Sequence, residues 1–414
     1  MGRTLAHLGA AQCDQSNIPK HATSSKITGK RKPKVEKATR GEGTTRSAQQ
    51  STKVVPVELQ QLVLNIFKDS FPAYFDSKLP ALVQQVKHHL YKREFNAAFE
   101  QDDFRAAYAA RWSPTRALAY THIFANLPPL TTELFPSLQG GPNSGEEESS
   151  RRAPHYRSEA VRTRVICIGA GAGAELVALG GYLKYLTSIT KSNHEAQQDE
   201  LVTHQPLQMT LGVTPIDIAD WKEITQTLYS SLTAAPSISH YASSEAKAAN
   251  APMIVSGMLD VHFVKQDILN MAIEEMGVIF TDTSLVTLMF TLNELYATSS
   301  SATTNLLLSL TMLLEPGALL LVVDSPGSYS TVNMGKPSSV KDGTNSEKKY
   351  PMQWLLDHTL LEASAVGSSK IASVERQWEK LESRDSEWFR LDGELRYPID
   401  LEDMRYHLHL YRRL

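Results

Sequence analysis

A glycine-rich turn directly after a short apolar run is the feature that most restricts the fold of this chain. The run at 165–168 predicts a buried strand, and glycine occupies positions 169, 171 and 173 immediately after it. Glycine lets the backbone turn sharply and approach a ligand where a side chain would collide. A helical pattern begins at about 174, so the free N–H groups of a helix start face the same place. The order of strand, turn and helix predicts the ligand-binding unit of a parallel α/β sheet.

The spacing of these glycines distinguishes between cofactors. The dinucleotide fingerprint G-x-G-x-x-G needs a third glycine where this chain has Ala174, and it needs an acid about 20 residues further on. The spacing G-x-G-x-G is instead typical of Rossmann-like methyltransferases, which use it to hold the methionine part of S-adenosylmethionine (SAM). Many of them carry an acid two residues before the first glycine, where this chain has Cys167. Glu175 either compensates or is only a first-turn residue favoured by the helix dipole.

Further apolar runs predict a mostly parallel sheet with helices on both faces, because they alternate with helical patterns. The predicted strands lie at 165–168, 209–213, 261–264, 285–290 and 318–323. The predicted catalytic domain spans 159–414, with flexible insertions at about 190–205, 233–252 and 327–350 where small and polar residues dominate. A small helical domain is predicted at 53–136, followed by a linker at 137–158.

Residues 1–52 form a polar segment with eight basic residues between Lys26 and Arg46, and such a segment buries too little apolar surface to fold alone. It is either a nuclear or nucleolar address, an arm that binds phosphates, or only a solubilising tail. The two cysteines are too few for a disulfide framework or a zinc cluster, which favours a reducing compartment. His407 and His409 alternate along a late strand pattern, and we expect a polar sheet face there rather than a metal site.

The apolar stretch at 306–323 is interrupted by Glu315, Pro316 and Gly317. It is therefore too short to cross a bilayer and predicts a helix, a turn and a buried strand. We expect no association with a membrane.

Two acids after predicted strands are candidate cofactor ligands. A carboxylate at Asp217 can accept both ribose hydroxyls, and an adjacent apolar or aromatic side chain can cover the adenine. Asp220 nearby has an alternative role as a helix N-cap before Trp221. Asp267 follows the third strand, where an acid can bind the adenine amino group, although a solvated loop acid is the competing interpretation.

The segment after the fourth strand carries the candidate catalytic groups. In this architecture the loop faces the transferred methyl group, so Asn293 can bind a base edge, Glu294 can take a proton and Tyr296 can stack. The competing interpretation is a plain helix start with Asn293 as its cap.

Several unusual strings occur together in this chain. They are Arg111-Trp-Ser-Pro-Thr-Arg116-Ala-Leu-Ala-Tyr120, the glycine turn, Asp217-Ile-Ala-Asp220-Trp221, Phe290-Thr-Leu-Asn293-Glu294-Leu-Tyr296, Asp385-Ser-Glu-Trp388-Phe389-Arg390, Tyr397-Pro398 and Met404-Arg405-Tyr406. With them the chain resembles, over about 57–414, the fungal methyltransferase family that modifies N3 of a uridine in large-subunit ribosomal RNA.

The resemblance implies a base methyltransferase with SAM as donor, acting as a monomer on ribosomal RNA or a pre-ribosomal particle in the nucleolus. It implies that SAM is held by Gly169, Gly171, Gly173 and Asp217. It places Asn293 and Glu294 near the target base, with Glu294 as candidate base and Arg390 as candidate stabiliser of the uracil anion. An arginine and aromatic mixture suits splayed-out bases, so the candidate residues of the substrate mouth are Arg111, Trp112, Trp388 and Phe389.

Two other functions compete with this one. In the first, the chain is a methyltransferase that acts on another RNA, a protein or a small molecule. In the second, it is a ribosome-assembly factor that keeps the fold without catalysis. The basic segment and the arginine–aromatic strings argue against the first alternative. The presence of Cys167, where many methyltransferases carry an acid, supports the second.

Overall fold

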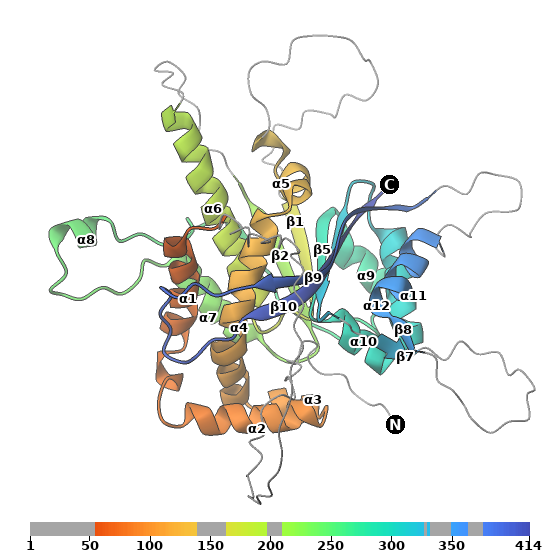
Figure 1. Cartoon of the computed structure of the whole chain (residues 1–414), viewed down its shortest axis with the longest axis horizontal. Coiled ribbons are helices and arrows are strands. Elements are labelled where there is room, and N and C mark those ends of the chain that lie inside the picture. The colour runs from red at the N-terminus through yellow and green to blue at the C-terminus, as the bar shows by residue number, and fades with distance from the viewer. Residues whose placement is uncertain (1–53, 139–162, 197–208, 327–328, 332–348, 363–375) are drawn as a thin grey trace, which may run out of the picture. The chain divides into compact units, whose positions relative to one another are not determined.

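The computed structural model describes residues 54–138, 163–196, 209–326, 329–331, 349–362 and 376–414 (Figure 1). The predicted basic segment at 1–52 and nearly all of the predicted linker at 137–158 lie outside the described residues. From Val54 onward, the described residues belong to one compact unit.

A central sheet of eight strands organises this unit. In spatial order its strands are β3 (Leu259–Val261), β2 (Leu211–Asp217), β1 (Thr163–Ile168), β5 (Thr283–Met289), β6 (Leu319–Asp324), β10 (Met404–Arg413) and β9 (Trp378–Phe389), and β4 (Val264–Lys265) also pairs with β2. All pairs from β3 to β6 are parallel, whereas β10 is antiparallel to both of its neighbours. The strand order reverses direction between β1 and β5. In open α/β sheets, ligands bind in a crevice at the carboxyl ends of the strands at such a reversal. The predicted Rossmann-like α/β fold is confirmed.

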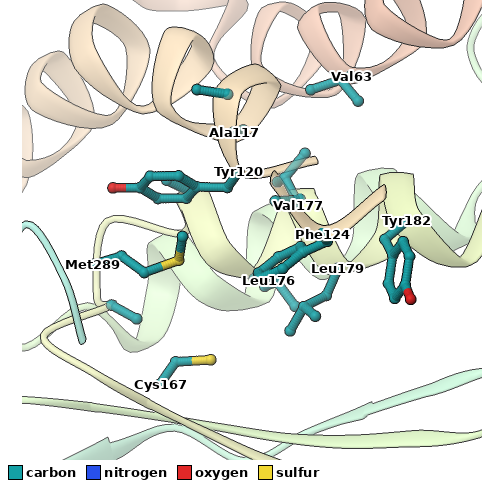
Figure 2. Close-up of a cluster of buried hydrophobic side chains, with 14 of the residues drawn as sticks. Val63, Ala117, Tyr120, Phe124, Cys167, Leu176, Val177, Leu179, Tyr182 and Met289 are labelled. Carbon is teal, nitrogen blue, oxygen red and sulfur yellow. The ribbon is translucent and has the colours of Figure 1, made fainter. Parts of the chain in front are cut away.

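One face of the sheet is covered by α1 (Val57–Ser70), α4 (Asp102–Ala125), α6 (Ala174–Ala196) and α7 (Lys222–Thr233). Figure 2 shows where α4 lies over α6, with Tyr120 and Phe124 of α4 packed near Leu176 and Leu179 of α6. Cys167 of β1 lies beneath them and is fully buried. The N-terminal helices therefore share one hydrophobic core with the sheet.

The opposite face is covered by α9 (Ile273–Phe280), α10 (Leu292–Thr298), α11 (Ser300–Leu313) and α12 (Met352–Asp357). Helix α11 is followed by a turn and then by β6, so the apolar stretch at 306–323 has the predicted helix, turn and strand. Among the described residues, no helix is long and apolar enough to cross a membrane.

His407 and His409 lie on this second face, and the expectation of a polar sheet face is wrong. His407 is 5% exposed and His409 is fully buried, because helices cover that face of β10. Nδ1 of His407 lies 2.9 Å from Nε2 of His409, and Nδ1 of His409 lies 3.0 Å from Oγ of Ser383 on β9. Burial lowers the pKa of His407 to about 4 and that of His409 to about 3, so both rings are neutral near pH 7.

The N-terminal segment contains α1, α2 (Leu79–Tyr91), α3 (Phe95–Phe99), α4 and α5 (Pro128–Leu134). Prolines in this segment do not always end a helix, as Pro114 and the pair Pro128 and Pro129 show. Helix α4 continues through Pro114, and the two prolines begin α5, because a proline at the first position of a helix has no N–H bond to lose.

Proline 114 stays inside α4 because another residue compensates for its missing N–H. In a regular helix the N–H of residue 114 would bond the carbonyl of Ala110, and here the hydroxyl of Tyr397 donates to that carbonyl at 2.8 Å. Helix α4 is thereby joined to the segment between β9 and β10.

We expect Tyr397→Phe to lower the free energy of unfolding by about 1–3 kcal/mol, because it leaves the Ala110 carbonyl without a donor. Chemical denaturation of the two proteins measures this difference. Tyr241 is 94% exposed, so Tyr241→Phe is the matched control and should have no measurable effect. Equal stability of both variants would contradict the compensating role of Tyr397.

The predicted insertions differ in part from the observed structure. Helix α6 continues to Ala196, beyond the predicted loop start at 190, because the polar residue types there are also compatible with helix. The segment 233–252 contains the short helix α8 (Ser244–Ala248), whose N-cap Ser243 accepts a bond from Ala246 N. Short strands β7 (Tyr329–Thr331) and β8 (Lys349–Pro351) pair with each other at the two ends of the third insertion.

Candidate cofactor and substrate site

The glycine turn contacts the carboxyl end of β2. The backbone N–H of Gly171 donates to Oδ2 of Asp217 at 3.1 Å. A Cβ on Gly171 would lie 2.0 Å from Cδ1 of Trp221, so only glycine fits at that position. The predicted turn and the predicted acid at the end of the second strand are therefore in direct contact.

The carboxylate of Asp217 is held in a buried position at the carboxyl end of β2. It is 3% exposed, and Oδ1 accepts a bond from Ala219 N at 3.0 Å. Burial raises the pKa of Asp217 to about 7, although the N–H groups of Ala219 and Gly171 and the side chain of Trp221 act in the opposite direction.

Glu175, in the first turn of α6, is a second buried carboxylate near the turn. It is 4% exposed, and its Oε1 has no hydrogen-bond partner among the described residues. Burial raises its pKa to about 8. Its carboxylate also raises the pKa of the Cys167 thiol, so it lies close to the position where many such enzymes carry the acid before the first glycine. This proximity favours the interpretation that Glu175 compensates for Cys167.

The loop after β5 is tied to the ends of two other strands. The hydroxyl of Thr291 donates to the carbonyl of Ile168 at 3.1 Å, at the end of β1. The N–H of Asn293 donates to Oδ2 of Asp324 at 2.9 Å, at the end of β6. Phe290 has a φ of +58°, which is strained for an aromatic residue. Such strain persists where surrounding contacts fix it, and it is frequent at functional sites.

Asp324 was not predicted as a site residue, although it ends a predicted strand as Asp217 does. It is 2% exposed, and its two oxygens accept bonds from Asn293 N and Ser325 N, the latter at 2.7 Å. Burial raises its pKa to about 6. The position of an acid at the end of a strand is the signal that identified Asp217, and the same signal would have found Asp324.

Helix α4 contributes a cation and two buried phenols that the sequence argument did not single out. The guanidinium of Arg116 donates to the hydroxyl of Tyr108, and its Cζ lies 5.6 Å from the centroid of the Phe290 ring. Tyr120 is buried beside them, and burial together with the Glu175 carboxylate raises its pKa well above the usual value. Arg116 and Tyr120 belong to the string that carries the family resemblance, so the string gave a signal without indicating their role.

Glu294 lies in the first turn of α10, at the edge of this group. It is half-buried, and burial raises its pKa while the Arg93 guanidinium lowers it. Its carboxylate also raises the pKa of Asp324, so the two acids are close. Asn293 precedes it and uses its backbone N–H in the bond to Asp324. The structure thus brings Asn293 and Glu294 to the carboxyl ends of β5 and β6.

Tyr296 is placed differently from the prediction. It is 2% exposed and belongs to the second core with Leu292 and Leu295. A residue two positions after Glu294 on a helix points about 200° away, so it faces the core instead of the crevice. The expected role of Tyr296 in substrate stacking is therefore wrong.

Asp267 lies after β4 and bonds within its own turn. Its Oδ1 accepts from Leu269 N at 3.0 Å, and its Oδ2 accepts from Nδ2 of Asn270 at 2.6 Å. The neighbouring Gln266 N donates to the carbonyl of Asp217, which places this turn beside the end of β2. Its role in adenine binding stays a prediction. Asp220 is exposed and pairs with Lys265 at 3.3 Å.

The string at 111–116 lies against the glycine turn. The hydroxyl of Ser113 donates to the carbonyl of Ala172 at 2.9 Å. The ring of Trp112 packs 5.0 Å from that of Tyr108, and Arg111 pairs with Glu402 at 2.6 Å. Arg111 and Trp112, two of the four residues predicted for the substrate mouth, are thus half-buried, and each already has a partner inside the protein.

The string at 385–390 ends β9, the edge strand of the sheet. Trp388 is 50% exposed, and Phe389 is buried with its ring 5.7 Å from that of His122. Arg390 pairs with Asp403 at 2.6 Å and lies over the Trp388 ring at 4.0 Å. Because β9 is three strands from β5, about 14 Å away, the structure does not place Arg390 beside Glu294. The role of Arg390 as anion stabiliser stays a prediction, whereas the guanidinium groups of Arg93 and Arg116 influence the pKa values of Glu294 and Asp324, respectively.

These residues fit SAM. Three buried carboxylates, Glu175, Asp217 and Asp324, lie near the carboxyl ends of the strands, and one oxygen of Glu175 has no hydrogen-bond partner among the described residues. Such a group complements the ammonium and sulfonium cations of SAM, while Asp217 offers acceptors to ribose hydroxyls and Arg116 supplies a cation. No group of three or more His, Cys, Asp or Glu side chains suited to a metal ion occurs within the described ranges.

We expect Gly171→Ala to weaken SAM binding at least tenfold and to destabilise the protein by about 1–3 kcal/mol, because the added methyl displaces Trp221. Calorimetric titration and thermal unfolding measure the two effects. A Cβ on Gly393 would contact nothing within 4 Å, so Gly393→Ala is the control and should bind SAM normally. Unchanged binding in Gly171→Ala would argue against a cofactor at this turn.

The fold reverses its strand order between β1 and β5, its glycine turn contacts a strand-end acid, and buried carboxylates lie beside the turn. Together these features indicate a methyltransferase that uses SAM. A family model described as "Putative SAM-dependent methyltransferase" matches residues 67–412, and the chain belongs to this family. The 25S rRNA (uridine(2843)-N(3))-methyltransferase of Saccharomyces cerevisiae is 32% identical to the chain over 360 residues, which are 85% of either protein. The predicted family and the predicted cofactor are confirmed.

Solved structures of methyltransferases are similar only at a distance. An O-methyltransferase family protein from Burkholderia thailandensis matches 89% of this chain and 74% of its own chain, with 13% identity and a TM-score of 0.31. A SAM-dependent methyltransferase from Clostridium acetobutylicum matches 61% of this chain and 85% of its own, with 10% identity and a TM-score of 0.26. Likenesses of this size say nothing about the site.

Proposed function

We propose that this chain methylates N3 of a uridine in large-subunit ribosomal RNA and that it does so in the nucleolus. The observation that carries the proposal is the position of Glu294, a half-buried carboxylate in the first turn of α10, whose start is bonded to the ends of β1 and β6. The reaction named for the yeast relative supports the choice of base and atom. The basic segment at 1–52 supports the location, because such segments serve as nuclear or nucleolar addresses.

The chemistry requires a base at this place. Bound SAM supplies a methyl group already activated on a sulfonium sulfur, so the protein mainly has to align the nucleophile and exclude water. Uridine N3 carries a proton and is a poor nucleophile until it loses it. As the bond from N3 to the methyl carbon forms and the bond from sulfur to carbon breaks, the N3 proton passes to the Glu294 carboxylate. We assign to Arg116 the stabilisation of the negative charge on the uracil carbonyl oxygens.

The substrate base has to be unpaired or flipped out, because N3 of uridine is engaged in a base pair within a helix. An unpaired base in a loop meets this requirement directly, so we expect loops of ribosomal RNA to be methylated faster than duplexes of the same sequence.

The test is methylation of large-subunit RNA fragments by the full chain with labelled SAM, followed by digestion to nucleosides and identification of the product. We expect N3-methyluridine, and we expect a fragment with cytidine at the target position to stay unlabelled. Transfer to transfer RNA or to protein, with ribosomal RNA left unmodified by an enzyme that binds SAM, would overturn the proposed substrate.

A further inference from the structure

The C-terminal end of α2 presents an unusual group of side chains. Lys87, Tyr91, Lys92 and Arg93 are all exposed, and Tyr91 is 83% exposed with no packing role in the core. The nearest acid in sequence, Glu94, already lies 2.9 Å from Nδ1 of His89. The C-terminal end of α2 therefore carries an excess of positive charge next to the exposed ring of Tyr91.

Arg93 has a backbone conformation that arginine rarely adopts. Its φ is +57°, at the position where the chain leaves α2. The N–H of Glu94 donates to the carbonyl of His89 at 2.9 Å, and the N–H of Arg93 donates to that of Leu90 at 3.0 Å. This bonding pattern ends many helices, and glycine is the usual residue at its left-handed position. An arginine there is strained, and strain of this kind is frequent at functional positions.

The C-terminal end of α2 brings Arg93 into electrostatic contact with Glu294 of α10. Figure 1 shows α2 and α3 lying across the carboxyl-end side of the sheet, on the side where α10 also lies. The Arg93 guanidinium lowers the pKa of Glu294, so the two side chains are close enough to interact. An exposed cation next to the candidate base is thus held by a rigid helix end.

We propose that Arg93 binds a backbone phosphate of the substrate RNA beside the target uridine, with Tyr91 and Lys92 continuing the contact along the strand. The proposal rests on the proposed function, because it takes RNA as the substrate. A planar guanidinium binds a phosphate with two parallel hydrogen bonds, and contacts of this type fix the register of the nucleic acid without reading its sequence. A phosphate held at Arg93 would set which nucleotide reaches Glu294.

Because the backbone of Arg93 is left-handed, glycine can replace this residue without straining the fold. Arg93→Gly removes the side chain and at the same time relieves the backbone strain, so the melting temperature should be unchanged or higher. We expect its affinity for an RNA fragment to fall about tenfold or more, the usual effect of losing a charged hydrogen bond. The slope of log K against log salt concentration should become shallower by about 0.7–0.9, the amount for one lost phosphate contact. SAM affinity should stay at the wild-type value.

Two further variants separate a phosphate contact from a structural role. Asp282 is exposed, has a φ of +55° and directly precedes β5, at the amino end of that strand. Asp282→Gly is therefore the matched control, and it should keep both RNA affinity and salt slope. Arg93→Lys keeps the charge, and we expect it to restore the salt slope while affinity recovers only in part, because an ammonium binds phosphate through a single point.

An unchanged affinity and salt slope in Arg93→Gly would overturn the proposal, and so would an equal loss in Asp282→Gly. These readouts are binding measurements and do not depend on which base is methylated. If wild-type protein binds RNA with a salt slope that depends on Arg93 but produces no N3-methyluridine, the proposed function fails while the Arg93 contact stands.

Discussion

Replacing Asp217 with alanine is expected to lower the affinity for SAM by about 10²–10⁴-fold while the protein remains folded. The carboxylate can accept both ribose hydroxyls, and two hydrogen bonds to a charged group contribute about 3–6 kcal/mol. The variant also removes the acceptor of the Gly171 N–H, so the glycine turn loses the bond that holds it to β2. Calorimetric titration of SAM into wild type and variant measures the difference.

The control for this substitution is three residues away. Asp220 is exposed, pairs with Lys265 and accepts a bond from Lys222 N, so Asp220→Ala should bind SAM as the wild type does. If Asp220→Ala lost binding and Asp217→Ala kept it, the assignment of the ribose ligand would have to move to Asp220.

Because of the buried carboxylates, the stability of the SAM-free protein should fall as the pH rises, whereas the affinity for SAM should increase. The pKa of Asp217 rises from 3.8 to about 7 on folding, so the folded state holds this proton more tightly than the unfolded chain does. Its contribution to stability is therefore present below about pH 4 and is lost as the pH rises through 7. Glu175, at about 8, and Asp324, at about 6, have the same sign.

SAM-free protein should accordingly be less stable at pH 8 than at pH 6. SAM carries cations that favour the ionised carboxylates, so its binding should release protons near pH 7. Thermal unfolding at several pH values and titrations in two buffers with different ionisation enthalpies test both points. A flat stability profile without proton release would mean that these acids are already ionised in the SAM-free protein.

The sequence predicted the parts of the site that depend on local order along the chain. A glycine turn after an apolar strand has few structural solutions, so the turn and the strand-end acid Asp217 were found in the expected contact. The helical character of the N-terminal segment was also visible from the sequence, but the continuation of α4 through Pro114 and the start of α5 at Pro128 were not.

Residues that act through contacts distant in sequence were not predictable in this way. Arg116 reaches Phe290 across 174 positions, and only the packing of α4 over the sheet brings them together. Arg390 has suitable chemistry but follows the edge strand β9, three strands from β5, and its role stays a prediction. Tyr296 and His407 show why burial was missed: a polar atom favours the surface in a sequence argument, but helices covering both faces of the sheet enclose these rings.

Glu294→Gln is the second substitution with a large expected effect, and it should lower kcat by about 10²–10⁴-fold. Glutamine keeps the size and the hydrogen-bonding capacity of the side chain but cannot accept the N3 proton. The affinity for SAM and for RNA should change little, because the loss concerns the reaction step. Single-turnover methylation of an RNA fragment, with SAM saturating, separates this step from binding.

The pH profile distinguishes a base from a residue that only shapes the loop. Burial raises the pKa of Glu294, so the wild-type rate should fall as the pH decreases through that raised pKa, and the residual rate of Glu294→Gln should lose this dependence. The ionised form is disfavoured in the folded state, so the glutamine variant should be at least as stable as the wild type at pH 8. Glu275 occupies the same third position of α9 and is exposed, which makes Glu275→Gln the matched control for any effect on a helix start. A Glu294→Gln enzyme with wild-type kcat and pH profile would exclude Glu294 as the base, and proton removal would then have to be assigned to another group at the carboxyl end of β5.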